Sequence, residues 1–140
     1  APAIMGGGMD KAHAQADAMI RLDAVRGKIA KAGLFVREKK FDEAFALYEE
    51  TLQTQPDDYS ALYQVGRLAA ETGQRLDRGL AALQRCLTLE PPAGQPGRAP
   101  THWRLGNIWE KKGDKAAARA AYEAALAADA AFENARTALK

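Results

Sequence analysis

The sequence has 140 residues, enough for one ordinary domain that buries a core without disulfides or metal ions. It is 47% hydrophobic and 27% charged, a balance typical of soluble globular proteins. The net charge of +2 argues against nucleic acid as a partner, because binding a phosphate backbone requires a concentrated basic face. No run of about 18 apolar residues is present, so we expect no membrane insertion. The single cysteine, Cys86, leaves the compartment open between cytoplasm and periplasm.

The N-terminal segment is predicted to differ from the rest of the chain. Residues 1–9 contain three consecutive glycines, which favour a flexible linker or a remnant of cloning. Because the chain begins Ala-Pro-Ala, we also expect it to be processed or cut from something longer. Asp10 is a plausible N-cap, and apolar residues at helical spacing continue to Val36. This pattern predicts one long first helix, which Gly27 and Gly33 weaken but need not break.

Six more helices are expected after a turn near residues 37–44. They are predicted at 41–53, 59–73 and 76–90, around Leu105 and Trp109, at 114–129, and from about Ala131. The segment 91–100, "PPAGQPGRAP", is rich in proline and glycine and is predicted to be a loop. No segment alternates polar and apolar residues with β-branched side chains, so no sheet is expected. The fold class is therefore all-α, with about seven helices arranged as helical hairpins.

The predicted hairpins repeat along the chain. Ala44 superposes on Gly79 after 35 residues, and Gly79 superposes on Ala118 after 39 residues. Residues 103–126, "WRLGNIWEKKGDKAAARAAYEAAL", resemble the tetratricopeptide repeat family, whose period is about 34 residues. The matching positions are Leu105, Gly106, Trp109, Ala118 and Tyr122, and the sequence departs from the family at His102, Gly79 and Ala130.

This resemblance implies a right-handed α-solenoid over residues 10–140. The implied units are approximately 25–58, 59–98 and 99–130, followed by a capping helix at 131–140. It also implies a non-enzymatic protein-protein interaction module that binds a peptide or a partner helix in a concave groove. By the family pattern, the residues facing that groove are Tyr63, Arg67, Glu71, Trp103, Asn107, Glu110 and Lys111.

The two tryptophans are expected to have different roles. Trp109 is in register with His102 and Leu105 and is predicted to lie in the core. Trp103 shares a helix face with Asn107 and Glu110, and the resemblance implies that this face lines the groove. Aromatic rings are frequent anchors at binding surfaces, so Trp103 is predicted to contact the partner. The alternative is that residues 93–98 or the first helix cover Trp103, which would make it purely structural.

Other motifs favour neither an enzyme nor a cofactor or metal site. His13 and Asp17 have metal-pair spacing on a helix, but no third ligand follows. Cys86 lies between leucines and is expected to be inert. Co-chaperones of this family bind a carboxylate with five polar residues, whereas the matching positions here are Ile29, Gly33, Gln64, Pro100 and Arg104. Only Arg104 agrees, so that chaperone clamp is not expected.

Two alternatives to groove binding remain open. The chain could be an accessory domain of a larger enzyme, joined to a catalytic part through its glycine-rich start. It could also be a self-association module that forms a homodimer through its first helix or its open end. In each case the partner is an unidentified protein or peptide.

Overall fold

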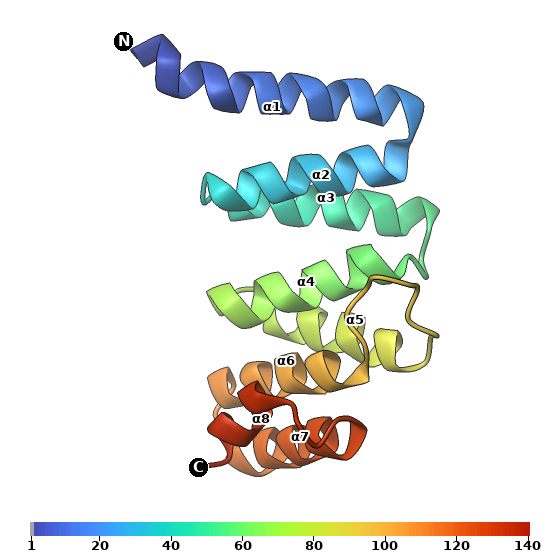
Figure 1. Ribbon diagram of the computed structural model, residues 1–140, viewed down its shortest axis with the longest axis vertical. Coiled ribbons are helices and arrows are strands. Elements are labelled where there is room, and N and C mark those ends of the chain that lie inside the picture. Colours follow the sequence, from blue (N-terminus) through green and yellow to red (C-terminus); the bar gives the residue numbers. More distant parts are fainter. Residues whose placement is uncertain (1) are drawn as a thin grey trace. The chain divides into compact units, whose positions relative to one another are not determined.

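The protein is described by a computed structural model over residues 2–140, with side chains from Gly8 onward, and this part of the chain contains no strand (Figure 1). The helices are α1 (Pro2–Leu22), α2 (Ala24–Arg37), α3 (Phe41–Thr54), α4 (Tyr59–Thr72), α5 (Leu76–Leu87), α6 (Arg98–Lys111), α7 (Lys115–Ala128) and α8 (Glu133–Ala138). The predicted all-α fold of helical hairpins is thereby confirmed. In the described chain, no helix has the length and apolar character that a membrane crossing requires.

The predicted single first helix is wrong, because the chain forms two helices there. Asp23 lies between α1 and α2 in an extended conformation, with φ −148° and ψ 99°. Its carboxylate accepts a hydrogen bond from the backbone N–H of Arg26 at 3.2 Å. An aspartate at this position satisfies a free N–H group at the start of a helix, so it favours a new helix over continuation of the old one.

Helix α1 begins earlier than the sequence pattern indicates. Its first residue is Pro2, so Asp10 lies inside the helix and is not its N-cap. Proline is well tolerated in a first turn, because its missing N–H would have no partner in the helix. The assignment of residues 1–9 to a linker or a remnant stays a prediction, as do the boundaries of the repeat units.

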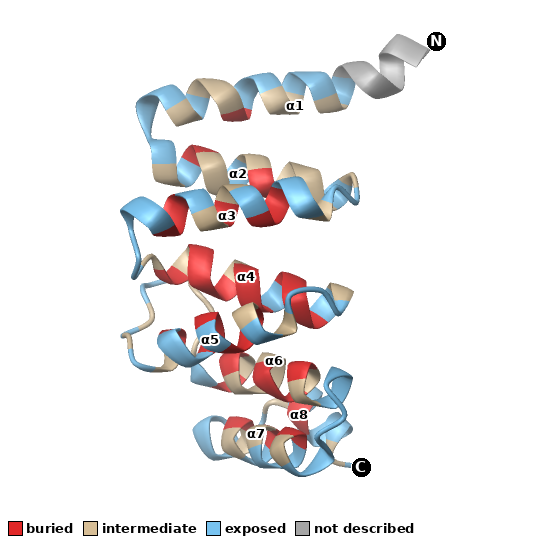
Figure 2. Ribbon diagram, turned by 180° about the vertical axis from the view of Figure 1, so that it is seen from behind, coloured by how far each residue is buried: buried red, intermediate tan, exposed pale blue. Residues whose placement is uncertain are grey.

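The chain divides into two compact units, one ending at Ala61 and the other spanning Leu62–Lys140, so the division falls within α4. In the first unit, α1 contacts α2 and α2 contacts α3. In the second unit, α5 contacts α6, α6 contacts α7, and α7 contacts α8. Figure 2 shows buried residues along one side of α3, α5 and α7, with exposed residues opposite. Each unit therefore builds its core from neighbouring amphipathic helices.

The turns follow the sequence signals closely, with one difference. Gly73 and Gly113 follow α4 and α6 with φ of +75° and +85°, a left-handed conformation that favours glycine after a helix. The predicted loop at 91–100 is too long, because α6 already begins at Arg98. Pro100 fits within the first turn of that helix, where no hydrogen bond is lost.

Two pairs of helices in the second unit use the same close contact. A Cβ atom added at Gly66 would lie 2.2 Å from Cγ of Leu83, and one added at Gly106 would lie 2.3 Å from Cε1 of Tyr122. Leu83 and Tyr122 are both buried. A glycine on one helix thus receives a large side chain from the next helix, and this contact recurs with the predicted repeat.

The C-terminal end of the second unit has its own apolar cluster. Its buried members are Ala118, Tyr122, Ala125 and Ala135, and the half-buried residues packed against them are Trp103, Trp109, Leu126, Phe132 and Leu139. Ala135 of α8 and the flanking residues Phe132 and Leu139 therefore pack on α7. Trp109 is half-buried rather than a fully enclosed core residue, and Trp103 packs on the same cluster.

Candidate functional site

The seven residues predicted to face a groove lie on two helices of the second unit, and we call their surface the α4–α6 face. It comprises Tyr63, Arg67 and Glu71 of α4 and Trp103, Asn107, Glu110 and Lys111 of α6. The four charged residues are exposed, Trp103 and Asn107 are half-buried, and Tyr63 is buried. The set therefore combines accessible charges with aromatic rings that are partly or wholly covered.

Three charged side chains join the two helices at this face. Arg67 Nε donates a hydrogen bond to Glu71 Oε1 at 3.0 Å, one helical turn away on α4. Arg104 of α6 brings its Nη2 to 3.4 Å from the same oxygen. The carboxylate of Glu71 thus lies between two guanidinium groups, and the cluster carries a net charge of +1. We call these three residues the Arg–Glu–Arg cluster.

The guanidinium group of Arg104 lies over the ring of Trp103. Its Cζ atom lies 4.2 Å from the centroid of the Trp103 ring, which is a cation–π contact. The rings of Trp103 and Phe132 meet in a T-shaped arrangement, with a centroid distance of 6.0 Å and an interplanar angle of 76°. The side chain of Arg104 is 14% exposed. Its Nε atom is buried and has no hydrogen-bond partner within residues 8–140.

Arg104 is the residue of this site that the sequence prediction missed. It matched the carboxylate clamp of the co-chaperones, but it was not among the residues predicted to face the groove. The relevant signal is an arginine directly after a groove tryptophan on the same helix. A long flexible side chain can turn back over a neighbouring ring, which helical register alone does not indicate.

Asn107 and Glu110 face α7 through the hydroxyl group of Tyr122. Asn107 Nδ2 donates a hydrogen bond to this hydroxyl at 3.1 Å. Burial raises the pKa of Tyr122 to about 12, and the nearby Glu110 carboxylate also raises it, while the Asn107 hydrogen bond lowers it. The side-chain amide of Asn107 is therefore engaged within the protein, although the sequence analysis placed it in the groove.

Tyr63 does not present an exposed ring. Its side chain is 4% exposed, so it offers very little surface for an incoming peptide. Of the two aromatic residues predicted to face the groove, Trp103 is therefore the more accessible. Trp103 is half-buried and its ring contacts Phe132, a residue that the sequence prediction did not place beside it.

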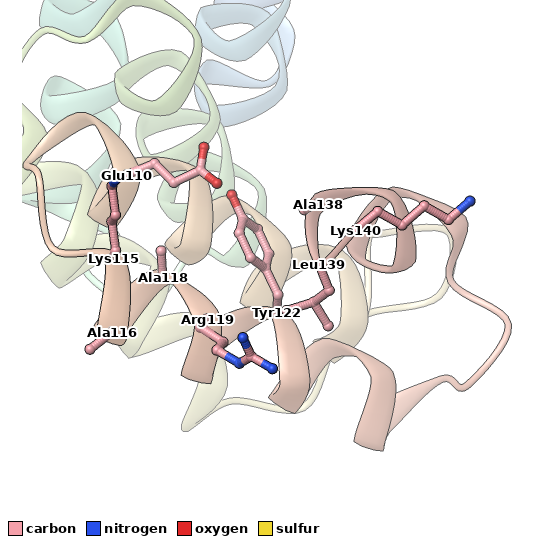
Figure 3. A pocket seen from close by; sticks show the side chains of 9 residues that line it. All are labelled: Glu110, Lys115, Ala116, Ala118, Arg119, Tyr122, Ala138, Leu139 and Lys140. Atoms are coloured by element: carbon pink, nitrogen blue, oxygen red, sulfur yellow. The ribbon is translucent and has the colours of Figure 1, made fainter.

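A cavity of about 410 Å³ lies at the other side of Tyr122, between α6, α7 and the end of the chain (Figure 3). Its lining residues are Glu110, Lys115, Ala116, Ala118, Arg119, Tyr122, Ala138, Leu139 and Lys140. Figure 3 shows the Tyr122 hydroxyl directed toward Glu110. The lining contains no serine, cysteine or histidine, so it holds no nucleophile beside a basic imidazole.

The remaining candidate residues are explained by packing. His13 Nε2 lies 2.8 Å from Glu38 Oε1, and Lys31 Nζ lies 2.5 Å from Asp17 Oδ1, so each member of this pair has a separate partner. Within residues 8–140, no group of three potential ligands could hold a metal ion. Burial raises the pKa of Cys86 to about 12, which keeps this thiol in its unreactive form at neutral pH.

The comparison with known families identifies the hairpin that carries most of this site. Residues 99–132 match a family model described as tetratricopeptide repeat. The matched segment contains α6 and α7 almost completely, including Trp103 and the Gly106–Tyr122 contact. A tetratricopeptide repeat supports a role in protein interaction, and domains of this kind are generally non-catalytic.

A solved structure extends the likeness beyond this hairpin. The crystal structure of BtubC (BKLC) from P. vanneervenii is similar to the chain with a TM-score of 0.68 and 23% sequence identity. The alignment covers 95% of this chain and 58% of BtubC, so the chain spans little more than half the length of that protein. At this identity the likeness concerns the fold alone. No curated protein matches the chain.

Proposed function

We propose that this protein is an interaction module that binds a peptide segment of a protein partner on the α4–α6 face. The observation that carries the proposal is the contact between Glu71 of α4 and Arg104 of α6 at 3.4 Å. It brings the exposed charges of Arg67 and Glu71 beside the largely buried guanidinium group of Arg104 and the half-buried Trp103. Arginine and tryptophan are enriched at binding hot spots, because they combine a large contact area with directional hydrogen bonding.

The other positions of the face support the same proposal. Lys111 lies beside the end of α4, since a Cβ atom added at Gly73 would be 3.7 Å from its Cδ. Exposed charged groups at the rim of an apolar contact typically orient a partner and speed its association. Asn107 and Tyr63 are better suited to support the face than to bind directly, because one is hydrogen-bonded internally and the other is buried.

The test begins with a random peptide library displayed on phage and selected against the full chain. The strongest selected peptide is then titrated into isotopically labelled protein, and amide and indole N–H signals are followed by NMR. We expect the largest shifts at Arg67, Arg104 and the indole of Trp103. Signals from α5 and from the exposed side of α7 should move much less, since they lie outside the face.

Two results would contradict the proposal. In the first, no peptide is enriched over an unrelated helical protein of similar size. In the second, a peptide binds but its shifts map to the cavity beside Tyr122 or to α1. Sedimentation velocity of the free chain over a range of concentrations separates the homodimer alternative, which requires a mass twice that of one chain.

A further inference from the structure

We propose that the cavity beside Tyr122 receives an amphipathic helix of a partner protein, which inserts an aliphatic side chain and places acidic side chains at the rim. This is the cavity of about 410 Å³ formed by α6, α7 and the end of the chain, and we call it the α7–α8 cavity (Figure 3). All its lining residues belong to the second unit. It shares Glu110 with the α4–α6 face and otherwise consists of different residues, so the inference goes beyond the proposed function.

The contact between α5 and α6 shows which side chain such a cavity accommodates. A Cβ atom added at Gly79 of α5 would lie 3.0 Å from Cδ1 of Ile108 on α6. Ile108 is completely buried, so its aliphatic side chain fills the space beside Gly79. Ala118 of α7 occupies the position of Gly79 in the repeat, 39 residues later. A helix that packs on α7 as α6 packs on α5 would therefore bring an aliphatic side chain beside Ala118.

Helix α8 covers only part of α7. It has 6 residues, whereas α6, which packs on α5, has 14. Ala135 of α8 and Leu139 pack on the C-terminal apolar cluster. Four residues of the first half of α7 line the cavity instead, namely Lys115, Ala116, Ala118 and Arg119. The cavity therefore lies directly past α8, where a longer helix would continue along α7.

The charge of the cavity rim indicates the chemistry of the partner. Glu110 lies beside the hydroxyl group of Tyr122, and Arg119 donates to Glu123 at 3.0 Å, so both charges are engaged within the protein. The remaining charged side chains of the lining are both basic and exposed, namely Lys115 and Lys140. Acidic side chains on an incoming helix would complement this charge, whereas basic side chains would be repelled.

Helical probe peptides test the inference on the full chain. The acidic probe has about 18 residues, enough to form a helix, with an alanine background, leucines one turn apart and glutamates on either side of them. The second probe carries lysine in place of every glutamate, and the third carries serine in place of the leucines. Fluorescence anisotropy gives the affinities, and NMR of isotopically labelled protein maps the contact.

We expect the acidic probe to bind about tenfold more tightly than the basic probe and the serine probe. The largest shifts should occur in the amides of residues 115–122 and 138–140. Ala116→Leu places a larger side chain in the lining from an exposed position and should weaken the acidic probe about tenfold. Ala127→Leu is the matched control, because Ala127 is exposed on the same helix outside the lining.

A second pair of variants tests the charge. Lys115→Glu should weaken the acidic probe about tenfold and tighten the basic probe. Lys111→Glu should have little effect, because Lys111 is an equally exposed lysine that belongs to the α4–α6 face and not to the cavity. Folding should be intact in Lys115→Glu, since an acidic residue is favourable in the first turn of a helix. Thermal melts like that of the parent would confirm this.

Four results would overturn the inference. Equal binding of the serine probe would mean that charge alone attracts the helix, and an equal or larger effect of Lys111→Glu would place the probe on the α4–α6 face. No binding at about millimolar probe would leave the cavity without the proposed partner. A dimer of the free chain in sedimentation velocity that Ala116→Leu disrupts would show that a second copy is the occupant. The phage-selected peptides are not used here, so failure of this inference is distinguishable from failure of the proposed function.

Discussion

Gly66 and Leu83 show how a single missing side chain determines the distance between two helices. Leu83 is completely buried, and a Cβ atom at Gly66 would lie 2.2 Å from its Cγ. Such a distance is far shorter than van der Waals contact, so the two groups cannot coexist without movement. The same arrangement recurs between Gly106 and Tyr122, which indicates that the contact is a property of the repeat.

The first prediction is that substitutions at Gly66 and Leu83 have non-additive effects on the free energy of unfolding. Gly66→Ala should destabilise the protein by about 1–3 kcal/mol through overpacking, although alanine favours helices. Leu83→Ala should cost on the order of 2–5 kcal/mol because it leaves a cavity. The double variant should cost clearly less than the sum, since the new methyl group occupies part of that cavity. Urea unfolding measured by circular dichroism provides the three free energies.

Gly33→Ala is the matched control for this cycle. Gly33 lies within α2, and a Cβ atom there would meet nothing within 4 Å. This substitution should therefore stabilise the protein by up to about 1 kcal/mol, as helix propensity alone predicts. Strictly additive costs for Gly66→Ala and Leu83→Ala would show that the two residues are not in close contact.

The second prediction concerns the pH dependence contributed by His102. Burial lowers the pKa of this imidazole below 6.5, and the neighbouring Arg98 guanidinium lowers it further. The folded state therefore binds fewer protons than the unfolded state as pH falls through this range. His102 should favour unfolding below about pH 6.5, and its full contribution is reached below the folded-state pKa.

His102→Gln tests this sign directly. The difference in unfolding free energy between pH 7.5 and pH 5 should be smaller in the variant than in the parent. Carboxylates titrate similarly in both proteins, so their contribution cancels in the comparison. A variant with the same pH dependence, or with a steeper one, would mean that protonation of His102 does not oppose folding.

At the scale of elements, α1 and α2 approach each other through Gly27. A Cβ atom at this position would lie 2.4 Å from the backbone nitrogen of Ile20. Backbone atoms cannot turn away as a flexible side chain can, so the two helices would have to separate. Among residues 8–22 of α1, Ala16 is buried, whereas Leu22 is 90% exposed. Polar contacts from His13 to Glu38 and from Lys31 to Asp17 also join the two helices.

The third prediction is that Gly27→Ala loosens α1 from α2. Hydrogen exchange of the α1 amides should become at least tenfold faster, because local opening requires less free energy when the helices are strained apart. Gly33→Ala lies on the same helix and should leave the exchange of α1 unchanged. Equal exchange in the two variants would show that the close approach at Gly27 does not hold α1 in place.

The same elements show what the sequence could and could not predict. Helical periodicity and the glycine positions were sufficient to place α3 to α7 within a few residues, whereas the contact between Gly106 and Tyr122 came only from the structure. Asp23 was missed because its capping role competes with an apolar pattern that continues through it. Arg104 was missed because register predicts the direction of Cβ, whereas a long side chain is positioned by its tertiary neighbours, here Trp103 and Glu71.

At the scale of the whole molecule, helices contact the helices that precede and follow them in the sequence. Within the second unit, α5 contacts α6, α6 contacts α7, and α7 contacts α8. Stability in such an array is nearly a sum of neighbour interfaces, so the loss of one interface acts mainly on the helix beside it. The last helix, α8, contributes buried Ala135 to the C-terminal cluster, with Leu139 packed directly after it.

The fourth prediction is a gradient of protection after deletion of residues 133–140. The deletion removes the apolar contacts that Ala135 and Leu139 make with α7. The lost burial of apolar surface should lower the free energy of unfolding by about 2 kcal/mol. Hydrogen exchange should then be roughly thirtyfold faster in α7, less affected in α6, and unchanged in α1, α2 and α3. Arg136→Ala removes only the exposed pair with Glu133 and serves as the control. A uniform acceleration in every helix would contradict the neighbour-by-neighbour description, because it would mean that the chain opens as one cooperative block.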